Sequence, residues 1–221
     1  MIIAIDTATP AVSVALAEGG EIVASFALLR ARRHVETLMP VIEQLLEHAQ
    51  VSYGEITCIA VDHGPGLFTG LRVGVATAKA LALALRVPIV SASSLELLAH
   101  DFAQRHDDGD VLAVIDARRR ELYAQTFSVR DGLVAGSGDP VCVSPVDADL
   151  LSGPGGASVR SVIGDAAVGS SVFAGRRIVP GYPRAERLAL RAPDLRPADP
   201  DQLELLYLRA PDAEINWTSR P

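Results

Sequence analysis

The sequence predicts an α/β protein made of two halves with the same topology, and three observations support this class. The first 28 residues contain three strand-like segments joined by tight turns. Helical and strand-like segments then alternate, which is typical of a sheet covered by helices. Finally, the opening pattern returns at a constant offset of 110 positions, so that Asp116 falls on Asp6. We therefore expect a mixed sheet with helices on its faces, built twice.

The first half can be followed along the chain by its hydrophobic periodicity. Alternating apolar residues predict the opening strands, and Gly19-Gly20 predicts a tight hairpin between two of them. Apolar residues three and four positions apart predict the helices, and Ser93 or Ser94 caps the last of these. The expected elements are strands at 1–6, 11–18 and 21–28, a helix at 34–49, a strand at 55–64, a helix at 70–86, a strand at 87–93 and a helix at 94–105.

The second half begins after the polar run "HDDGD". The segment 113–127, "AVIDARRRELYAQTF", repeats the strand, acidic turn and strand of residues 3–17. A further strand runs into Gly164-Asp165, and the segment 201–216 predicts a short helix and a docking segment. The boundary gives an amino-terminal subdomain, residues 1–105, and a smaller carboxy-terminal subdomain, residues 106–221, whose tail can pack back.

Composition and charge limit the class of protein. The chain is 49% hydrophobic with a formal charge of −7, which suits a soluble globular protein. This acidity argues against a broad non-specific grip on nucleic acid, although a local patch at Arg30, Arg32 and Arg33 stays open. We expect no signal peptide and no membrane span, because Lys79 and Arg86 interrupt the most apolar run. Cys58 and Cys142 are expected as buried thiols in a reducing cytoplasm.

The glycine-rich stretch "VDHGPGLFTGLRVG" resembles a phosphate-binding loop, but it fits neither common motif. A P-loop needs a lysine after its last glycine, where this chain has Leu71 and Arg72. Gly64, Gly66 and Gly70 are one residue too widely spaced for a dinucleotide-binding loop. Amide groups near a helix amino terminus still favour anions. The simpler explanation is that the glycines permit a tight turn and close packing.

Small residues recur every four positions along the helix that follows this loop. Gly70, Gly74, Ala78 and Ala82 form a smooth stripe, along which another helix can approach closely. That helix could belong to the same chain or to another subunit. Because the other faces of residues 70–86 are apolar too, one sheet surface does not easily cover them all, and an intermolecular interface is favoured.

Few residues suit catalysis. The five histidines form no HExxH motif, and no two have the spacing of a metal-binding pair backed by a carboxylate. Asp6 and Asp116 end strands at acidic turns, where phosphate-transfer folds hold magnesium, but aspartate is also a common turn residue. The candidates for a vestigial nucleotide site are Asp6, Gly64, Gly66, Gly164 and Asp165.

Several motifs together resemble one family. The segments "MIIAIDTAT", "VDHGPGLFTGLRVGVATAKALALAL", "VPIVSASSLELLA", "VLAVIDARRRELYAQTF" and "LYLR" are similar to the TsaB (YeaZ) family of tRNA threonylcarbamoyladenosine biosynthesis. The resemblance spans nearly the whole chain. It implies the actin, heat-shock chaperone and sugar-kinase fold, with two duplicated ribonuclease-H-like halves.

The same resemblance implies a scaffold without catalytic activity. The catalytic relative TsaD carries an HxxxH metal pair, and Ser94 and Leu98 fall on those two positions here. The family pairs with TsaD through its amino-terminal helices and acts with a TsaE-like ATPase, so tRNA is reached indirectly and a homodimer can form without the partner. No cofactor is expected, except ATP bound weakly or at the complex interface. The implied interface residues are Val35, Leu38, Met39, Ile42, Leu45, Gly70, Gly74, Ala78, Leu81 and Ala82.

Two other functions stay open. One is an ATP-dependent phosphotransferase or metalloprotease-like enzyme of the same fold, which would need Asp6, the loop over 64–70 and the turn at Gly164-Asp165. The other is a chaperone or protease cofactor that controls the level of the partner protein rather than its chemistry.

Overall fold

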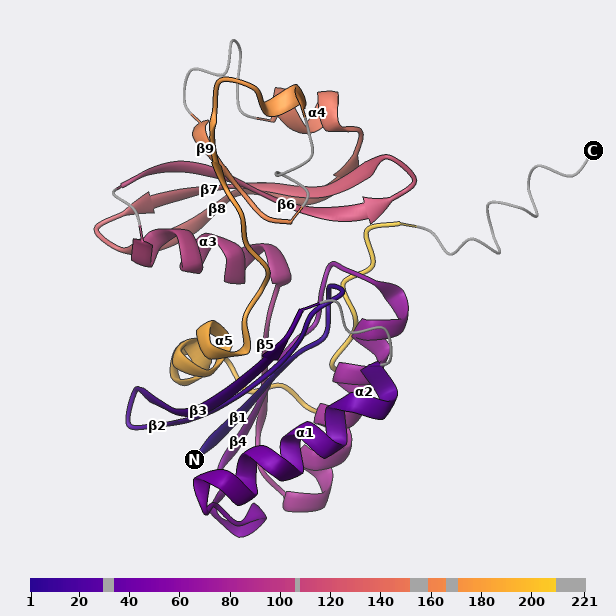
Figure 1. The fold of residues 1–221 in the computed structure, drawn as a ribbon, viewed down its shortest axis with the longest axis vertical. Helices are drawn as coiled ribbons and strands as arrows, with labels where there is room; N and C mark the ends of the chain where they lie inside the picture. The colour runs from indigo at the N-terminus through magenta and orange to yellow at the C-terminus, as the bar shows by residue number, and fades with distance from the viewer. Residues whose placement is uncertain (30–33, 106–107, 152–158, 166–170, 210–221) are drawn as a thin grey trace, which may run out of the picture.

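The computed structural model describes residues 1–29, 34–105, 108–151, 159–165 and 171–209. They form two five-stranded sheets, the first in the lower and the second in the upper part of Figure 1. The first sheet has the order β3-β2-β1-β4-β5. The β1–β2 and β2–β3 pairs are antiparallel, and the β1–β4 and β4–β5 pairs are parallel. Its strands are β1 (Ile2–Asp6), β2 (Val12–Glu18), β3 (Glu21–Leu28), β4 (Cys58–Asp62) and β5 (Ile89–Ala92).

The second sheet repeats this topology with the order β10-β9-β6-β7-β8. Its β6–β7 and β7–β8 pairs are antiparallel, and its β6–β9 and β9–β10 pairs are parallel. Two mixed sheets with equivalent strand order confirm the predicted α/β class and agree with the duplicated actin-like fold that the resemblance implied. The strands are β6 (Gly109–Arg118), β7 (Glu121–Arg130), β8 (Leu133–Val143), β9 (Val159–Ile163) and β10 (Arg177–Val179).

Helices cover both faces of the first sheet. α1 (His34–Ala49) and α2 (Phe68–Leu85) lie on one face, and the short α5 (Ala185–Arg191) lies on the other. The alternation along β1 explains this division. Ile3 and Ile5 point into the core beneath α1 and α2, whereas Ala4 points toward α5. Small side chains on that second face let α5 approach the sheet closely.

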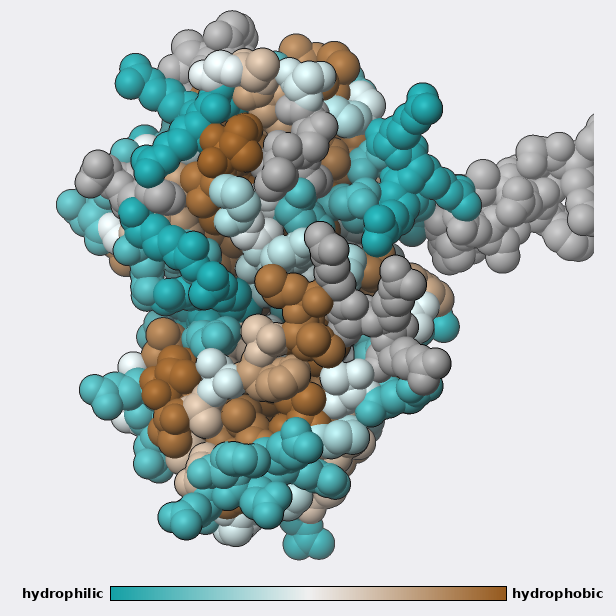
Figure 2. Space-filling model, in the orientation of Figure 1, coloured by the Kyte–Doolittle hydropathy of each residue, from teal (hydrophilic) through white to brown (hydrophobic). Residues whose placement is uncertain are grey.

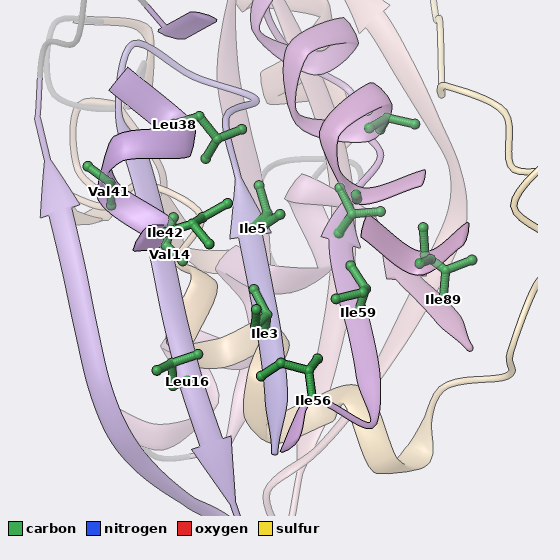
Figure 3. Close-up of a cluster of buried hydrophobic side chains, with 14 of the residues drawn as sticks. Ile3, Ile5, Val14, Leu16, Leu38, Val41, Ile42, Ile56, Ile59 and Ile89 are labelled. Atoms are coloured by element: carbon green, nitrogen blue, oxygen red, sulfur yellow. The ribbon is translucent and has the colours of Figure 1, made fainter. Parts of the chain in front are cut away.

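The main core lies between the first sheet and α1. Figure 3 shows side chains of β1 and β2 beneath those of α1. Ile59 of β4 and Ile89 of β5 lie farther along the sheet, where α2 completes the same core. Leu38 and Ile42 each retain 1% of their exposed area. Burial of a side chain of this size contributes about 1.5–3 kcal/mol to the stability of the fold. The inner face of α1 therefore packs on the first sheet and is not available to a partner protein.

The helix that follows β5 covers the second sheet instead. α3 (Ser94–Arg105) packs on β6, β7 and β8, and its amino terminus is capped by the Ser93 hydroxyl, which accepts the N–H of Glu96 at 3.1 Å. α4 (Pro145–Leu150) covers the opposite face. Short 3₁₀ turns lie at Tyr53–Glu55, Ser171–Phe173 and Ala192–Asp194.

A division of the chain at residue 105 therefore separates the two sheets but not the helices that cover them. α3 precedes the division yet packs on the second sheet, whereas α5 follows it yet packs on the first. After α5 the chain returns along the first sheet, where the Ala198 N–H donates to the Ile89 carbonyl at 2.8 Å. For 201–216 the predicted short helix is wrong within 201–209, which are irregular, but the predicted docking is confirmed there, because Leu203 joins the main core and the Leu206 N–H donates to the His63 carbonyl at 2.9 Å. Residues 210–216 lie outside the described residues.

The length of α2 corrects one expectation. Among the described helices, α2 is long and apolar enough to cross a membrane by length and composition alone, which the sequence-based expectation did not allow. A core helix of a soluble protein passes the same test. In this structure one face of α2 packs on β4 and β1. The basic patch considered at Arg30, Arg32 and Arg33 lies outside the described residues.

Candidate functional site

The glycine loop between β4 and α2 is filled by the turn that follows β1. A Cβ atom at Gly66 would overlap the carbonyl oxygen of Ala8, and one at Gly70 would overlap that of Thr7. The Leu67 N–H donates to the same Ala8 carbonyl at 2.6 Å. The loop therefore holds a segment of its own chain where a phosphate would have to lie.

The stripe of small residues on α2 also faces the inside of the chain. It was expected to form an intermolecular interface, and the structure corrects this. Gly70, Gly74, Ala78 and Ala82 are all buried within the chain. A Cβ at Gly74 would overlap the hydroxyl oxygen of Thr7, which donates to the Gly70 carbonyl at 2.8 Å. Close approach explains the two glycines, and the approaching segment is the β1–β2 turn. Ala78 and Ala82 pack in the core against the first sheet.

Beneath the loop lies a pair of buried acids. Asp6 accepts the Ala8 N–H at 2.9 Å and the Ser13 hydroxyl at 3.3 Å. Asp62 accepts the Gly64 N–H at 2.8 Å and the Ser94 hydroxyl at 2.7 Å. Burial raises the pKa of Asp62 to about 6, and burial together with the charge of Asp62 raises the pKa of Asp6 well above its usual value.

These bonds make the acid pair a structural junction. The Ser13 hydroxyl that donates to Asp6 also accepts the N–H of Ala185, the first residue of α5, at 2.9 Å. The pair thus connects the first turn, the glycine loop and the starts of α3 and α5. Asp6 has no exposed surface, so it does not reach the cleft as a vestigial nucleotide site would require.

The equivalent turn in the second half is also closed. Gly164 has a φ of +141°, and a Cβ there would overlap the Val114 carbonyl oxygen. Asp165 accepts the N–H of Asp116 at 3.2 Å. Of the five vestigial candidates, Gly66 lines the cavity described below, whereas Gly164 and Asp165 contact β6.

The positions that match the TsaD histidines are part of the core. The Ser94 hydroxyl donates to Asp62, and Leu98 packs with the second sheet; both residues are fully buried. Within the described ranges, no cluster of three or more histidine, cysteine, aspartate or glutamate residues could hold a metal. Cys58 and Cys142 are free and half-buried, rather than fully buried as expected.

A cavity of about 400 Å³ opens between the two halves. It lies where the amino terminus of α2, the turn between β6 and β7, and the returning tail meet. Its lining residues are Gly66, Leu67, Phe68, Asp116, Ala117, Arg118, Arg119, Tyr123, Tyr207 and Arg209. Sequence reasoning missed this site, because its aromatic residues come from distant segments. The run of three arginines after Asp116 was the available signal.

The outer face of α2 is the second candidate site. Every exposed residue between Val73 and Leu85 is apolar, namely Ala76, Ala80, Leu83 and Ala84. Beside them, Leu81 is half-buried. On α1, Met39 and Leu45 are half-buried, and Val35 is 68% exposed. Figure 2 shows hydrophobic surface on the amino-terminal half, above a band of polar surface at its lower end.

Comparison with known sequences places these features in a family. The family model described as "TsaD: tRNA N6-adenosine threonylcarbamoyltransferase" matches residues 22–176. The tRNA threonylcarbamoyladenosine biosynthesis protein TsaB of Bacillus subtilis is 30% identical, over 98% of this chain and 97% of its own length. An uncharacterized protein of Mycobacterium leprae is 36% identical over 97% of this chain. The chain spans only 56% of the length of that relative.

Solved structures agree with the sequence comparison. A Pseudomonas aeruginosa protein, described as similar to the peptidase YeaZ, has a TM-score of 0.82 and 28% identity. The match covers 94% of this chain and 99% of that protein. A second structure, YeaZ from the same organism, has a TM-score of 0.80. The chain therefore belongs to the TsaB (YeaZ) family, whose sequences are related to the TsaD transferases.

Proposed function

We propose that this chain is a non-catalytic cytoplasmic subunit in tRNA threonylcarbamoyladenosine biosynthesis, and that it binds and activates a TsaD-like catalytic subunit. The name of the Bacillus subtilis relative and that of the matching family model support this role. The TsaD-like subunit transfers threonylcarbamoyl to the adenosine beside the anticodon of ANN-decoding tRNAs, with help from a TsaE-like ATPase.

The observation that carries the proposal is the outer face of α2, which no described segment of the chain covers. Its inner face is used by the β1–β2 turn and the sheet, yet Ala76, Ala80, Leu83 and Ala84 remain exposed on a helix of 18 residues. Small apolar side chains let a partner helix approach closely, and contiguous apolar surface marks an interaction site. We therefore propose this outer face as the interface, in place of the stripe at Gly70 and Gly74. The residues at its edge are Val35, Met39, Leu45 and Leu81.

We propose that the chain is not an enzyme because the residues at the positions that catalysis would require are unsuitable. Ser94 and Leu98 are buried where the catalytic relative carries histidines, and neither side chain is a metal ligand of the required kind. Asp6 is sealed beneath the first turn, so it does not reach a nucleotide in the cleft. An ATP-dependent phosphotransferase would need that carboxylate exposed.

The test is co-purification from the native cytoplasm, followed by identification of the bound chains. We expect a TsaD-like protein with the wild-type chain, and its loss with Ala80→Glu, because a buried unpaired charge disrupts an apolar interface. Leu133→Glu, at a position 76% exposed on the second sheet, is the matched control and should retain the partner. A wild-type chain that brings down only copies of itself would contradict the proposal.

Depletion experiments separate activation from control of partner level. We expect the modified nucleoside to fall while the amount of TsaD-like protein stays constant. If the amount of TsaD-like protein fell together with the modified nucleoside, the chain would instead act by controlling the level of its partner, as a chaperone or protease cofactor does.

A further inference from the structure

The cleft cavity contains an aromatic platform that the proposed function does not use. The rings of Phe68 and Tyr207 lie 5.3 Å apart between centroids, with 34° between their planes. The guanidinium group of Arg72 lies 3.8 Å from the centre of the Phe68 ring, and its Nε donates to the Tyr207 hydroxyl at 3.3 Å. Phe68 is 47% and Tyr207 45% exposed, so a fixed pair of rings is half open to solvent.

Arginines of the β6–β7 turn line the side of the cavity opposite the two rings. Their backbone conformation is one that arginine disfavours. The β6–β7 register pairs Arg118 with Glu121, which leaves Arg119 and Arg120 as a two-residue hairpin loop. Their φ angles are +54° and +62°, and Arg118 has +63°. Turns with two positive φ angles strongly prefer Asn-Gly or glycine pairs, because a side chain is strained in the left-handed region.

Other hairpins of this chain follow that preference. The β2–β3 turn uses Gly19-Gly20 and the β7–β8 turn uses Asp131-Gly132, all at positive φ. Only at the cleft, among these three hairpins, do arginines occupy both loop positions. A residue held against its local preference beside a cavity points to function rather than to stability.

We propose that this cleft binds an unpaired nucleotide of an RNA strand. The base stacks on the Phe68–Tyr207 platform, and the phosphate lies against the arginines of the β6–β7 turn. Aromatic rings bind bases that are free of a stack, and arginine binds phosphate in a planar, two-pronged geometry. The cavity of about 400 Å³ lies in the size range of small-ligand sites.

This inference deepens the proposed function, because it gives the chain a direct contact with the RNA in place of an indirect one. The formal charge of −7 does not oppose it, since binding depends on the local charge of the cleft. Arg118 pairs with Asp116 at 2.9 Å, but both side chains are largely exposed and such pairs are weak. A phosphate can therefore compete for the guanidinium group.

The test compares two matched arginine variants. Arg119→Gly and Arg86→Gly each remove one charge and one strained left-handed residue, at φ +54° and +57°. Glycine adopts a positive φ without strain, so both variants should fold, and thermal unfolding of each checks this. Arg86 follows the carboxyl end of α2, whereas Phe68 begins that helix, so about 27 Å separate the two sites.

Fluorescence anisotropy with a labelled RNA hairpin that has an unpaired loop measures the affinity. We expect Arg119→Gly to bind about tenfold more weakly and to reduce the salt slope by about 0.7, as for one lost phosphate contact. Arg86→Gly should bind like wild type. Phe68→Leu keeps apolar bulk but removes the stack, and should also weaken binding about tenfold.

A fully paired RNA of the same length and free AMP complete the experiment. The cleft should bind the unpaired loop in preference to the paired RNA, and AMP should bind far more weakly than the hairpin. Equal affinity for paired and unpaired RNA, no effect of Arg119→Gly, or binding of AMP as tightly as the hairpin would each overturn the inference. Measurements with and without the TsaD-like subunit keep the two proposals distinct, since assembly without RNA contact at the cleft contradicts only this one.

Discussion

Asp6 and Asp62 are neighbours across two parallel strands, and both carboxyl groups are buried. Ile5 pairs with Val61, so the two aspartates follow at the same level of β1 and β4. Burial raises the pKa of both acids, and the charge of Asp62 raises that of Asp6 further. The pair therefore retains a proton at a higher pH than exposed aspartates would, at the junction that joins the first turn to α3 and α5.

The first prediction concerns pH. A raised folded-state pKa means that the folded chain binds more protons than the unfolded chain between the two pKa values. The stabilising contribution of Asp62 is thus full below its ordinary pKa of 3.8 and is lost as the pH rises through about 6. The loss amounts to roughly 2–3 kcal/mol.

Asp62→Asn isolates this effect. An asparagine keeps an oxygen for Gly64 and Ser94 and directs its amide group toward Asp6 without a charge. Urea unfolding at pH 5 and pH 8 should show the variant gaining stability relative to wild type as the pH rises. An unchanged difference between the two proteins at both pH values would contradict the assignment.

The second prediction concerns Gly70. Alanine normally favours a helix over glycine by about 1 kcal/mol. Here the added Cβ would overlap the Thr7 backbone carbonyl, so Gly70→Ala should destabilise the chain by about 2–4 kcal/mol. Thr69→Ala, at the exposed neighbouring position, is the control and should change stability by only a few tenths of a kcal/mol. A higher thermal midpoint for Gly70→Ala would show that the contact with Thr7 is wrong.

The third prediction uses the difference between Gly70 and Gly74. At Gly74 the overlap is with the Thr7 side chain rather than its backbone. Thr7→Ala should therefore restore much of the stability that Gly74→Ala loses, but should not rescue Gly70→Ala. Thermal unfolding of the two double variants measures this coupling. Equal rescue of both glycine variants would contradict the geometry.

The periodicity of the sequence was sufficient for the elements but not for their orientation. It identified the strands of the first sheet, the helices at 34–49, 70–86 and 94–105 and the duplicated sheet, because a repeat of two or 3.6 residues records which residues share a face. It did not identify β10, α4 or α5. It did not record which face of α2 points inward, because Gly70, Gly74, Ala76 and Ala80 are all small and apolar. Contact with Thr7, some sixty residues earlier in the chain, decides the orientation.

The packing of α3 and α5 and the cleft were also beyond sequence reasoning. Both depend on segments that meet only after folding. Phe68 and Tyr207 contribute rings from segments far apart in the sequence, and nothing near either residue indicates the other. The arginines of the β6–β7 turn were visible as a run, but their significance depends on the positive φ angles that the hairpin imposes.

The central claim is that the outer face of α2 is the surface that binds the TsaD-like subunit. Isothermal titration calorimetry of the purified subunit against this chain, with Ala80→Glu and Leu133→Glu in parallel, tests it most directly. We expect Ala80→Glu to weaken binding by about a hundredfold or more, while its thermal midpoint stays close to wild type and Leu133→Glu binds normally. Normal binding by a folded Ala80→Glu variant would contradict it.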